Sequence, residues 1–378
     1  MTADSVSIYP CGSYETHDIE NALHGVLAPI GGLGWVRQGM VIAIKVNLVT
    51  FMRPETAAVS HPAPVVALCR MLSKRGASVV VGDSPGGPFN ASLVNRVYSA
   101  AGMKTVEEAG ASLNSDYSVS EVEFPGGKAL QKFQYTAWLS KADAIINFCK
   151  LKTHGLMALS CGVKNIFGAI PGTRKPELHY TFPKIDNFAD MLVDLCEYVK
   201  PALTIVDAVV GMEGNGPTHG SPREIGALIA SKSAYSADLL SDALIGLAPQ
   251  SVPTIASAIS RGLSPVSVRD LEIIGPWLDF AISDFKLQPL RDSTRFEKNR
   301  IISTLFSRVF TLFSNVSPEK CVGCRVCADV CPQKTIVIKD RLAVISRKKC
   351  ISCFCCGEFC PKGAIEMRRT RVAQFLTK

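Results

Sequence analysis

Two short segments of the sequence concentrate the residues best suited to redox or metal chemistry. KCVGCRVCADVCP (residues 320–332) and KCISCFCCGEFCP (residues 349–361) both follow the pattern C-x2-C-x2-C-x3-C-P. Nine of the 14 cysteines lie between Cys321 and Cys360, and this crowding in a long chain favours metal ligation over disulfide bonds. Zinc is the alternative, but four-cysteine zinc sites normally separate two C-x2-C pairs by a longer stretch. The motifs therefore predict iron-sulfur clusters.

The spacing also predicts how the thiolates are shared between two [4Fe-4S] clusters. Three closely spaced cysteines can wrap one face of an iron-sulfur cube, whereas the fourth, before the proline, reaches the other cube. Each cluster should then take three ligands from one motif and one from the other. The expected ligand sets are Cys321, Cys324, Cys327 and Cys360 for one cluster, and Cys350, Cys353, Cys356 and Cys331 for the other.

Residues 317–367 resemble the bacterial-type ferredoxin with two four-iron clusters, and TIVIKDRLAVI between the motifs predicts two short strands. Cys355 departs from the pattern as an extra thiol, either a spare cysteine or a surrogate ligand. From Ser317 onward the chain has 13 Lys and Arg against 5 Asp and Glu, which accounts for the whole net charge of +8. An oxidised cluster with four thiolates carries about −2, so two clusters would offset about half of this excess.

The preceding residues alternate strand and helix patterns, which predicts a three-layer α/β domain with a mostly parallel sheet over residues 1–280. Residues 110–135 interrupt this alternation and predict an insertion or a hairpin. The expected strands are 41–49, 77–83, 143–150, 203–210 and 225–231, and the expected helices are 62–76, 157–167, 184–199 and 234–247. A small α+β ferredoxin-like domain over 317–367 should follow a helical linker at 281–316, with a basic tail at 368–378. One apolar face is expected in the linker, formed by Ile302, Leu305, Phe306, Val309 and Phe313.

Basic residues gather where one predicted strand ends. Lys150, Lys152 and His154 close the strand at 143–150, and Lys164 and Asn165 follow on the next helical pattern. The carboxyl ends of strands in an open α/β sheet border the ligand crevice, so this grouping suits an anionic ligand. Simple solvation of these lysines is the alternative.

Polar residues also follow the other strands. Lys45 and Asn47 end the strand at 41–49, and Asp83 opens a glycine-rich turn. Loops after strands carry function disproportionately, although turn formation alone also explains such residues. The remaining candidates are His61 before a helix, and Asp207, Glu213 and His219 in VDAVVGMEGNGPTHG. The chain has no P-loop and no G-x-G-x-x-G motif, which weakens a dinucleotide-dependent interpretation.

Taken in order, these motifs resemble the domain of unknown function 362 family across residues 5–275. The shared stretches are IKVNLV, SHPAPVV, GDSPGG, KLKTH, GVKNIFGAIPG, VDAVVGMEGNGP and ADLLSDALIG, with Val46 where the family pattern has proline. The resemblance implies a domain often joined to a two-cluster ferredoxin and supplies no settled reaction. The site positions that it implies are Lys45, Asn47, His61, Asp83, Lys152, His154, Lys164, Asn165, Asp207, Glu213 and Asp238.

The sequence thus predicts an iron-sulfur electron-transfer protein whose two clusters relay electrons to or from an anionic ligand in the α/β domain. As an enzyme it would be a ferredoxin-dependent reductase, an oxidoreductase in which Lys152, His154 and Lys164 are the catalytic candidates. The alternative is a non-catalytic electron carrier whose α/β domain serves docking or maturation. A redox partner protein or a small anionic substrate is expected, without nucleic-acid binding, because no aromatic-basic pattern accompanies the charge. Without a long apolar run, a cytoplasmic location is expected.

Overall fold

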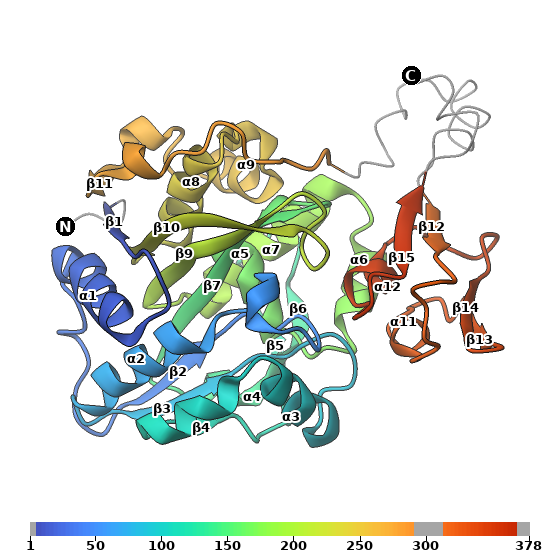
Figure 1. The fold of residues 1–378 in the computed structure, drawn as a ribbon, viewed down its shortest axis with the longest axis horizontal. Coiled ribbons are helices and arrows are strands. Elements are labelled where there is room, and N and C mark those ends of the chain that lie inside the picture. The colour runs from blue at the N-terminus through green and yellow to red at the C-terminus, as the bar shows by residue number, and fades with distance from the viewer. Residues whose placement is uncertain (1–4, 291–312, 369–378) are drawn as a thin grey trace.

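The computed structural model describes residues 5–290 and 313–368. Within these residues, a nine-stranded sheet forms the centre of the larger unit, in the order β11-β1-β10-β9-β7-β2-β3-β4 with β8 added to β7 (Figure 1). The strands are β1 (Ser5–Pro10), β2 (Val41–Lys45), β3 (Ser78–Gly82), β4 (Ser112–Leu113), β7 (Ala144–His154), β8 (Ala158–Ser160), β9 (Leu203–Glu213), β10 (Ser221–Ser231) and β11 (Glu272–Ile274).

Most neighbouring strands of this sheet run parallel, as the sequence predicts. β2 is parallel to β3 and β7, β7 to β9, β3 to β4 and β1 to β11. β10 lies antiparallel to both β9 and β1, and β8 folds back antiparallel on β7. The long central strands β7 and β9 are buried on both faces, which explains why apolar residues occupy both faces of their first halves.

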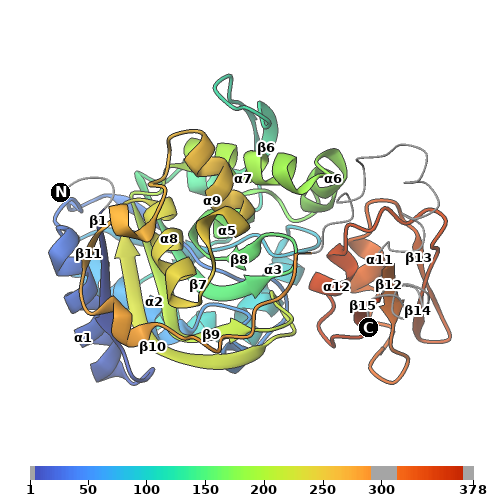
Figure 2. The same ribbon diagram turned by 90° about the horizontal axis from the view of Figure 1, so that it is seen from above.

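Helices cover both faces of the sheet and complete the three layers (Figure 1, Figure 2). Ile42 and Ile44 pack with α1, α2 and α3, whereas Ala43 between them faces the layer that contains α7. α8 packs on the same side as α7, against β9 and β10. The helices of the larger unit are α1 (Thr16–Leu27), α2 (Pro62–Ser73), α3 (Ala91–Ala100), α4 (Ala137–Ser140), α5 (Gly162–Asn165), α6 (Lys175–Thr181), α7 (Ile185–Val199), α8 (Ala234–Leu244) and α9 (Pro253–Ser260).

None of the helices within the described ranges has the length and apolar character needed to cross a bilayer. Short 3-10 turns link several of the elements. The turns are η1 (Ala28–Ile30), η2 (Pro54–Thr56), η3 (Met103–Ala109), η4 (Ile166–Ala169), η5 (Pro249–Ser251), η6 (Val268–Asp270) and η7 (Trp277–Phe280). The hairpin predicted near residues 110–135 is present as β5 (Val119–Glu123) paired with β6 (Lys132–Thr136).

The helix predicted over residues 157–167 is wrong. β7 continues to His154, and Ala158–Ser160 folds back on it as β8, so only the four residues of α5 and the η4 turn are helical. Short apolar runs fit a strand as well as a helix, and here pairing with the extended end of β7 decides the outcome. The strand predicted at 41–49 ends at Lys45.

The smaller unit contains two antiparallel strand pairs and two short helices. β12 (Phe313–Val316) pairs with β15 (Ile365–Arg368), and β13 (Ile336–Lys339) pairs with β14 (Leu342–Ile345), the two strands predicted between the motifs. The helices are α11 (Val326–Asp329) and α12 (Cys355–Glu358). The predicted linker helix falls mainly on residues 291–312, outside the described residues, as does the tail beyond 368. Phe313 was assigned to that helix but begins β12, because its backbone pairs with Arg368.

Candidate functional site

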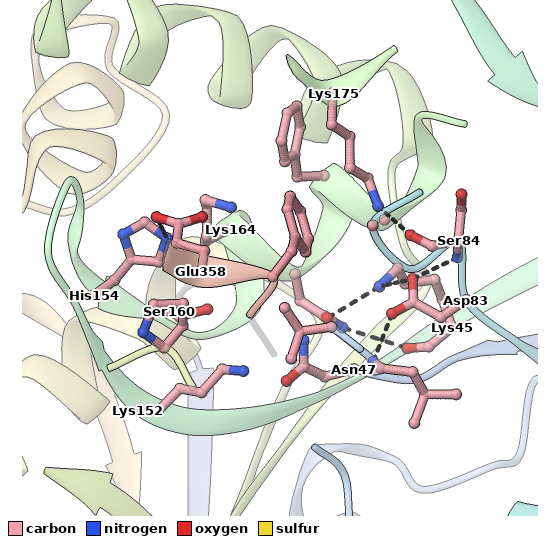
Figure 3. Close-up of a pocket in the computed structure, with 18 of the residues that line it drawn as sticks. Lys45, Asn47, Asp83, Ser84, Lys152, His154, Ser160, Lys164, Lys175 and Glu358 are labelled. Carbon is pink, nitrogen blue, oxygen red and sulfur yellow. Dashed lines mark hydrogen bonds and ion pairs between the residues drawn. The ribbon is translucent and has the colours of Figure 1, made fainter. Parts of the chain in front are cut away.

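A cavity of about 60 Å³ lies beyond the carboxyl ends of β2, β3 and β7 (Figure 3). Parallel strands bring the residues after them to one edge of the sheet, which is where the sequence predicts a ligand crevice. The cavity is large enough for a few water molecules or a small ion. The sequence-predicted residues that line it are Lys45, Asn47, Asp83, Lys152, His154, Lys164 and Asn165.

A buried ion pair forms the floor of the cavity. Lys45 Nζ lies 2.7 Å from Asp83 Oδ1 and donates a hydrogen bond of 3.0 Å to Asn165 Oδ1. Burial lowers the pKa of Lys45, and the charge of Asp83 opposes that shift. A Cβ on Gly168 would lie 2.0 Å from Asp83 Oδ1 and 2.3 Å from Lys45 Nζ, so only glycine allows the backbone to approach this pair.

Three further lysines surround the cavity. Lys152 Nζ donates to Ala58 O at 2.6 Å, and Lys175 Nζ donates to Ser84 O. Burial lowers the pKa of each of these two amines to about 7, and for Lys152 the charge of Lys164 adds to the effect. Lys164 Nζ lies 4.6 Å from the centre of the Phe167 ring.

The lining therefore contains four lysines against two carboxylates, Asp83 and Glu358. Burial is the main cause of the lowered pKa values of these lysines, and repulsion among the buried amines adds to it. A bound anion would relieve this repulsion. The electrostatics of the cavity thus match a small anionic ligand.

One wall of the cavity comes from the smaller unit. His154 Nε2 lies 3.6 Å from Glu358 Oε1, and Thr218 Oγ1 donates to Glu358 O at 3.0 Å. Phe359, which follows α12, is 6% exposed and lies so close to Gly86 that a Cβ there would be 2.1 Å from its ring. The two units therefore enclose the site together (Figure 3).

Hydrogen bonds fix the orientation of His154. Its Nδ1 accepts from the backbone N–H groups of Leu156 (3.1 Å) and Met157 (3.3 Å), in the turn between β7 and β8. In a neutral ring the proton then lies on Nε2, which faces Glu358. His154 can thus donate a proton from Nε2, the ring nitrogen that faces the cavity residue Glu358.

Sequence reasoning did not assign several residues of this lining to the site. Lys175 lies on α6, and His179 one turn later is neutral because burial lowers its pKa to about 3. Glu358 and Phe359 are hidden within the second cysteine motif, where ligand spacing dominates the pattern. Lys175 is the exception, because the sequence did suggest that Arg174 and Lys175, after the Pro171-Gly172 turn, add to the rim of the crevice, and of these two Lys175 lines the cavity.

Other predicted residues lie away from the cavity. Asp207 pairs with Lys150 Nζ at 2.9 Å on the sheet face covered by α1 and α2, where Tyr14 bonds both groups. His61 caps α2 through Ala63 N and stacks on Tyr14 with ring centres 3.6 Å apart. These residues form a second buried network, not part of the cavity lining.

Two predicted carboxylates stabilise backbone segments instead. Asp238 accepts from Gly162 N at 2.5 Å and Val163 N at 3.0 Å, at the start of α5, which carries Lys164. Burial raises the pKa of Asp238 to about 7. Glu213 accepts from Lys286 N at 3.1 Å, and His219, in the loop after β9, lies against Gly363 of the smaller unit.

The cysteine sulfurs have surroundings that fit iron-sulfur clusters. Backbone N–H groups point at three of the predicted ligand sulfurs, with Ser352 N, Thr335 N and Ala364 N lying 3.3–3.4 Å from Cys350, Cys331 and Cys360 respectively. Such hydrogen bonds tune cluster potentials. A second cavity is lined by all four cysteines of one predicted set, which are Cys321, Cys324, Cys327 and Cys360.

The extra thiol has a packing role in this arrangement. Cys355 is fully buried and packs with Val330 and Phe359, in a cluster that Val49 of the larger unit also touches. Its sulfur donates to Cys353 O at 3.9 Å. Cys355 therefore belongs to the contact between the two units.

Comparisons with known proteins agree with this division. A family model described as a domain of unknown function (DUF362) matches residues 42–241, and one described as a 4Fe-4S dicluster domain matches residues 314–361. A protein of Synechocystis sp. (strain ATCC 27184 / PCC 6803 / Kazusa), named as thylakoid-associated, is 30% identical over 318 residues, covering 82% of this chain and 95% of that protein.

Two solved structures also match part of the chain. The lactate racemase apoprotein from Thermoanaerobacterium thermosaccharolyticum matches with a TM-score of 0.41 and 15% identity, over 64% of this chain and 58% of that one. A Thermotoga maritima protein matches with a TM-score of 0.32 and 14% identity, over 55% of this chain and 53% of that one. The match thus spans little more than half the length of each solved structure.

Proposed function

Because the chain belongs to the DUF362 family and carries a 4Fe-4S dicluster domain, we propose that it exchanges electrons between two [4Fe-4S] clusters and a small anion in the cavity. Two bound clusters would together supply or accept two electrons, which matches a two-electron reaction. The proposed ligands are Cys321, Cys324, Cys327 and Cys360 for the first cluster, and Cys350, Cys353, Cys356 and Cys331 for the second.

The observation that carries this proposal is the shared wall of the cavity. Glu358 and Phe359 line the lysine-rich cavity, and they stand in the chain between Cys356 and Cys360, one proposed ligand of each cluster. A ligand bound there would lie beside the protein segment that holds the clusters. This placement favours a site that uses electrons over a module that merely docks.

The cavity residues would bind the anion and supply protons. Lys45 is held by Asp83, whereas Lys152 and Lys175 have pKa values of about 7 and can hold or release a proton near neutral pH. His154 presents a second donor at Nε2. In a reductase these groups would stabilise negative charge on the reacting anion and protonate its reduced form.

The test begins with oxygen-free purification and mass spectrometry of small molecules that copurify with the protein. Binding and turnover of the molecule found are then compared in Lys152→Met and Lys164→Met variants, with exposed Lys74→Met as the control. We expect both cavity variants to lose binding and turnover while their iron content stays that of the wild type. Unchanged binding and turnover would favour the alternative, a plain electron carrier.

A further inference from the structure

The first proposed cluster set lies on the outer side of the smaller unit. Cys324 is exposed and Cys321 is half-buried, whereas Cys353 and Cys355 pack with Phe359 and Val49 at the contact between the units. The cavity lined by the first cysteine set also includes Val322 and Arg325, both exposed. One cluster position thus borders solvent while the other borders the larger unit.

The surface around the outer position is basic. Residues 313–368 contain 10 Lys and Arg, all of them exposed, against five Asp and Glu, of which Glu358 is buried. Arg325 and Lys362 line the cavity of the first cysteine set, and the backbone of Arg341 lies beside Gly323 in the same loop, whereas Lys320 pairs with Glu366 at 3.1 Å. No Asp or Glu is among the described residues that line the cavity of these cysteines, and Val322, 45% exposed, adds an apolar contact point.

We propose that this face docks an acidic electron-carrier protein, which reduces the outer cluster before the inner one. The proposal rests on the electron-transfer function above. In each encounter the reduced carrier loses one electron and the outer cluster gains it, without bond breaking or proton transfer. Cys350, Cys353, Cys356 and Cys331 would hold the second cluster, which would receive that electron beside the anion cavity.

Charge and exposure together favour this occupant. A face of one sign raises the rate of encounter with an oppositely charged protein by about 10- to 1000-fold at low ionic strength. Weak electron-transfer encounters need only small contact areas, which an exposed ligand loop with an apolar centre and a basic rim provides. A small anionic reductant would not need the apolar contact at Val322.

The experiment measures cluster reduction by stopped flow in the full-length, cluster-loaded protein. The donors are reduced flavodoxin, an acidic protein, and the reduced methyl viologen cation. The test variant is Arg325→Glu/Arg341→Glu/Lys362→Glu, at three exposed positions. The control variant, with the same change in charge, is Lys74→Glu/Arg75→Glu/Lys104→Glu, at exposed positions of the larger unit.

We expect the test variant to lose at least about tenfold in its rate with flavodoxin at low salt, but not with methyl viologen, and the control to lose far less. Equal losses in both variants, or none, would overturn the proposal. Iron and sulfide contents separate this result from failure of the clusters themselves. If the test variant contains too little iron, the wild-type protein provides a second test. A rate of cluster reduction by flavodoxin that does not fall as the salt concentration rises would also refute the proposal.

A vesicle-binding assay tests whether a membrane, and not a protein, occupies this face. The proposal fails if the three residues are required for cosedimentation with phosphatidylserine-containing vesicles but not for the flavodoxin rate. It stands if the flavodoxin rate depends on them.

Discussion

Substituting Gly86 tests the contact that closes the cavity. A Cβ at this position would lie 2.1 Å from Phe359 Cδ1 and Cε1 and 2.6 Å from Cζ. Carbon atoms pack without repulsion from about 3.5 Å, so Gly86→Ala must push the ring back by about 1.4 Å. The ring is buried against Val330, Cys355 and Val49, and overpacking of this kind typically costs about 1–3 kcal/mol. The docked state should weaken by roughly 5- to 150-fold.

The assay is hydrogen-deuterium exchange of residues 354–360, together with anion binding and iron content. Gly86→Ala should raise exchange and weaken anion binding, with iron content unchanged. Gly12→Ala is the matched control, because a Cβ there would meet no atom within 4 Å. In a Phe359→Ala background the substitution should have no further effect. If Gly86→Ala causes the same loss with or without the Phe359 ring, the steric reasoning is refuted.

Three further predictions concern charge and ligation. Phosphate affinity, measured by calorimetry, should fall as the pH rises above about 7, because Lys152 and Lys175 then lose their protons. The expected loss is up to about tenfold per pH unit for each of these lysines. An affinity that stays constant from pH 6 to pH 9 would contradict this. Lys152→Met should raise the free energy of unfolding of the ligand-free protein, measured in urea titrations. The Lys152 amine has a pKa of about 7 in the folded protein and about 10.5 in the unfolded chain, so the stability of the wild type rises as the pH rises from about 7 to about 10.5. The advantage of the variant should therefore be largest below pH 7 and should shrink between pH 7 and pH 10.5. Cys356→Ser should reduce iron from about eight toward about four atoms per chain, whereas Cys355→Ser should leave it unchanged; equal losses would make Cys355 a ligand.

Local patterns in the sequence predicted the layers of the fold well, because buried parallel strands and amphipathic helices have periodicities that neighbouring residues reveal. They failed where tertiary pairing decides the structure. Residues 158–160 are a strand because β7 extends past the end of β2, and β8 pairs with that extension at residues 152–154. Likewise, Phe313 is extended because β15, some 50 residues later, provides its partner.

The candidate site was predictable to the extent that parallel strands share one edge. That rule correctly grouped Lys45, Asp83 and Lys152, which follow or end different strands. It could not separate Asp207 from them, because the sequence does not show which strand residues lie beyond the end of a neighbouring strand. Lys152 has the same parity on β7 as Lys150, but it lies well past the last pair between β2 and β7, Lys45 with Asn147. Lys150 and Asp207 share the parity of Phe148 and Ile205, which pack toward α1 and α2.

The contribution of Glu358 has a physical consequence for how the two units work together. The larger unit alone would present four lysines with Asp83 as their single carboxylate partner in the lining, and Glu358 adds the second. Docking of the smaller unit therefore lowers the positive charge of the cavity, which by itself opposes anion binding, while it excludes water, which strengthens the attraction between Lys152 and a bound anion. The anion and the docked unit then stabilise each other by thermodynamic linkage, provided that the anion needs the wall formed by Phe359. A ligand that bound equally well to both arrangements could not favour docking, so anion-dependent protection of residues 354–360 from exchange measures this coupling directly.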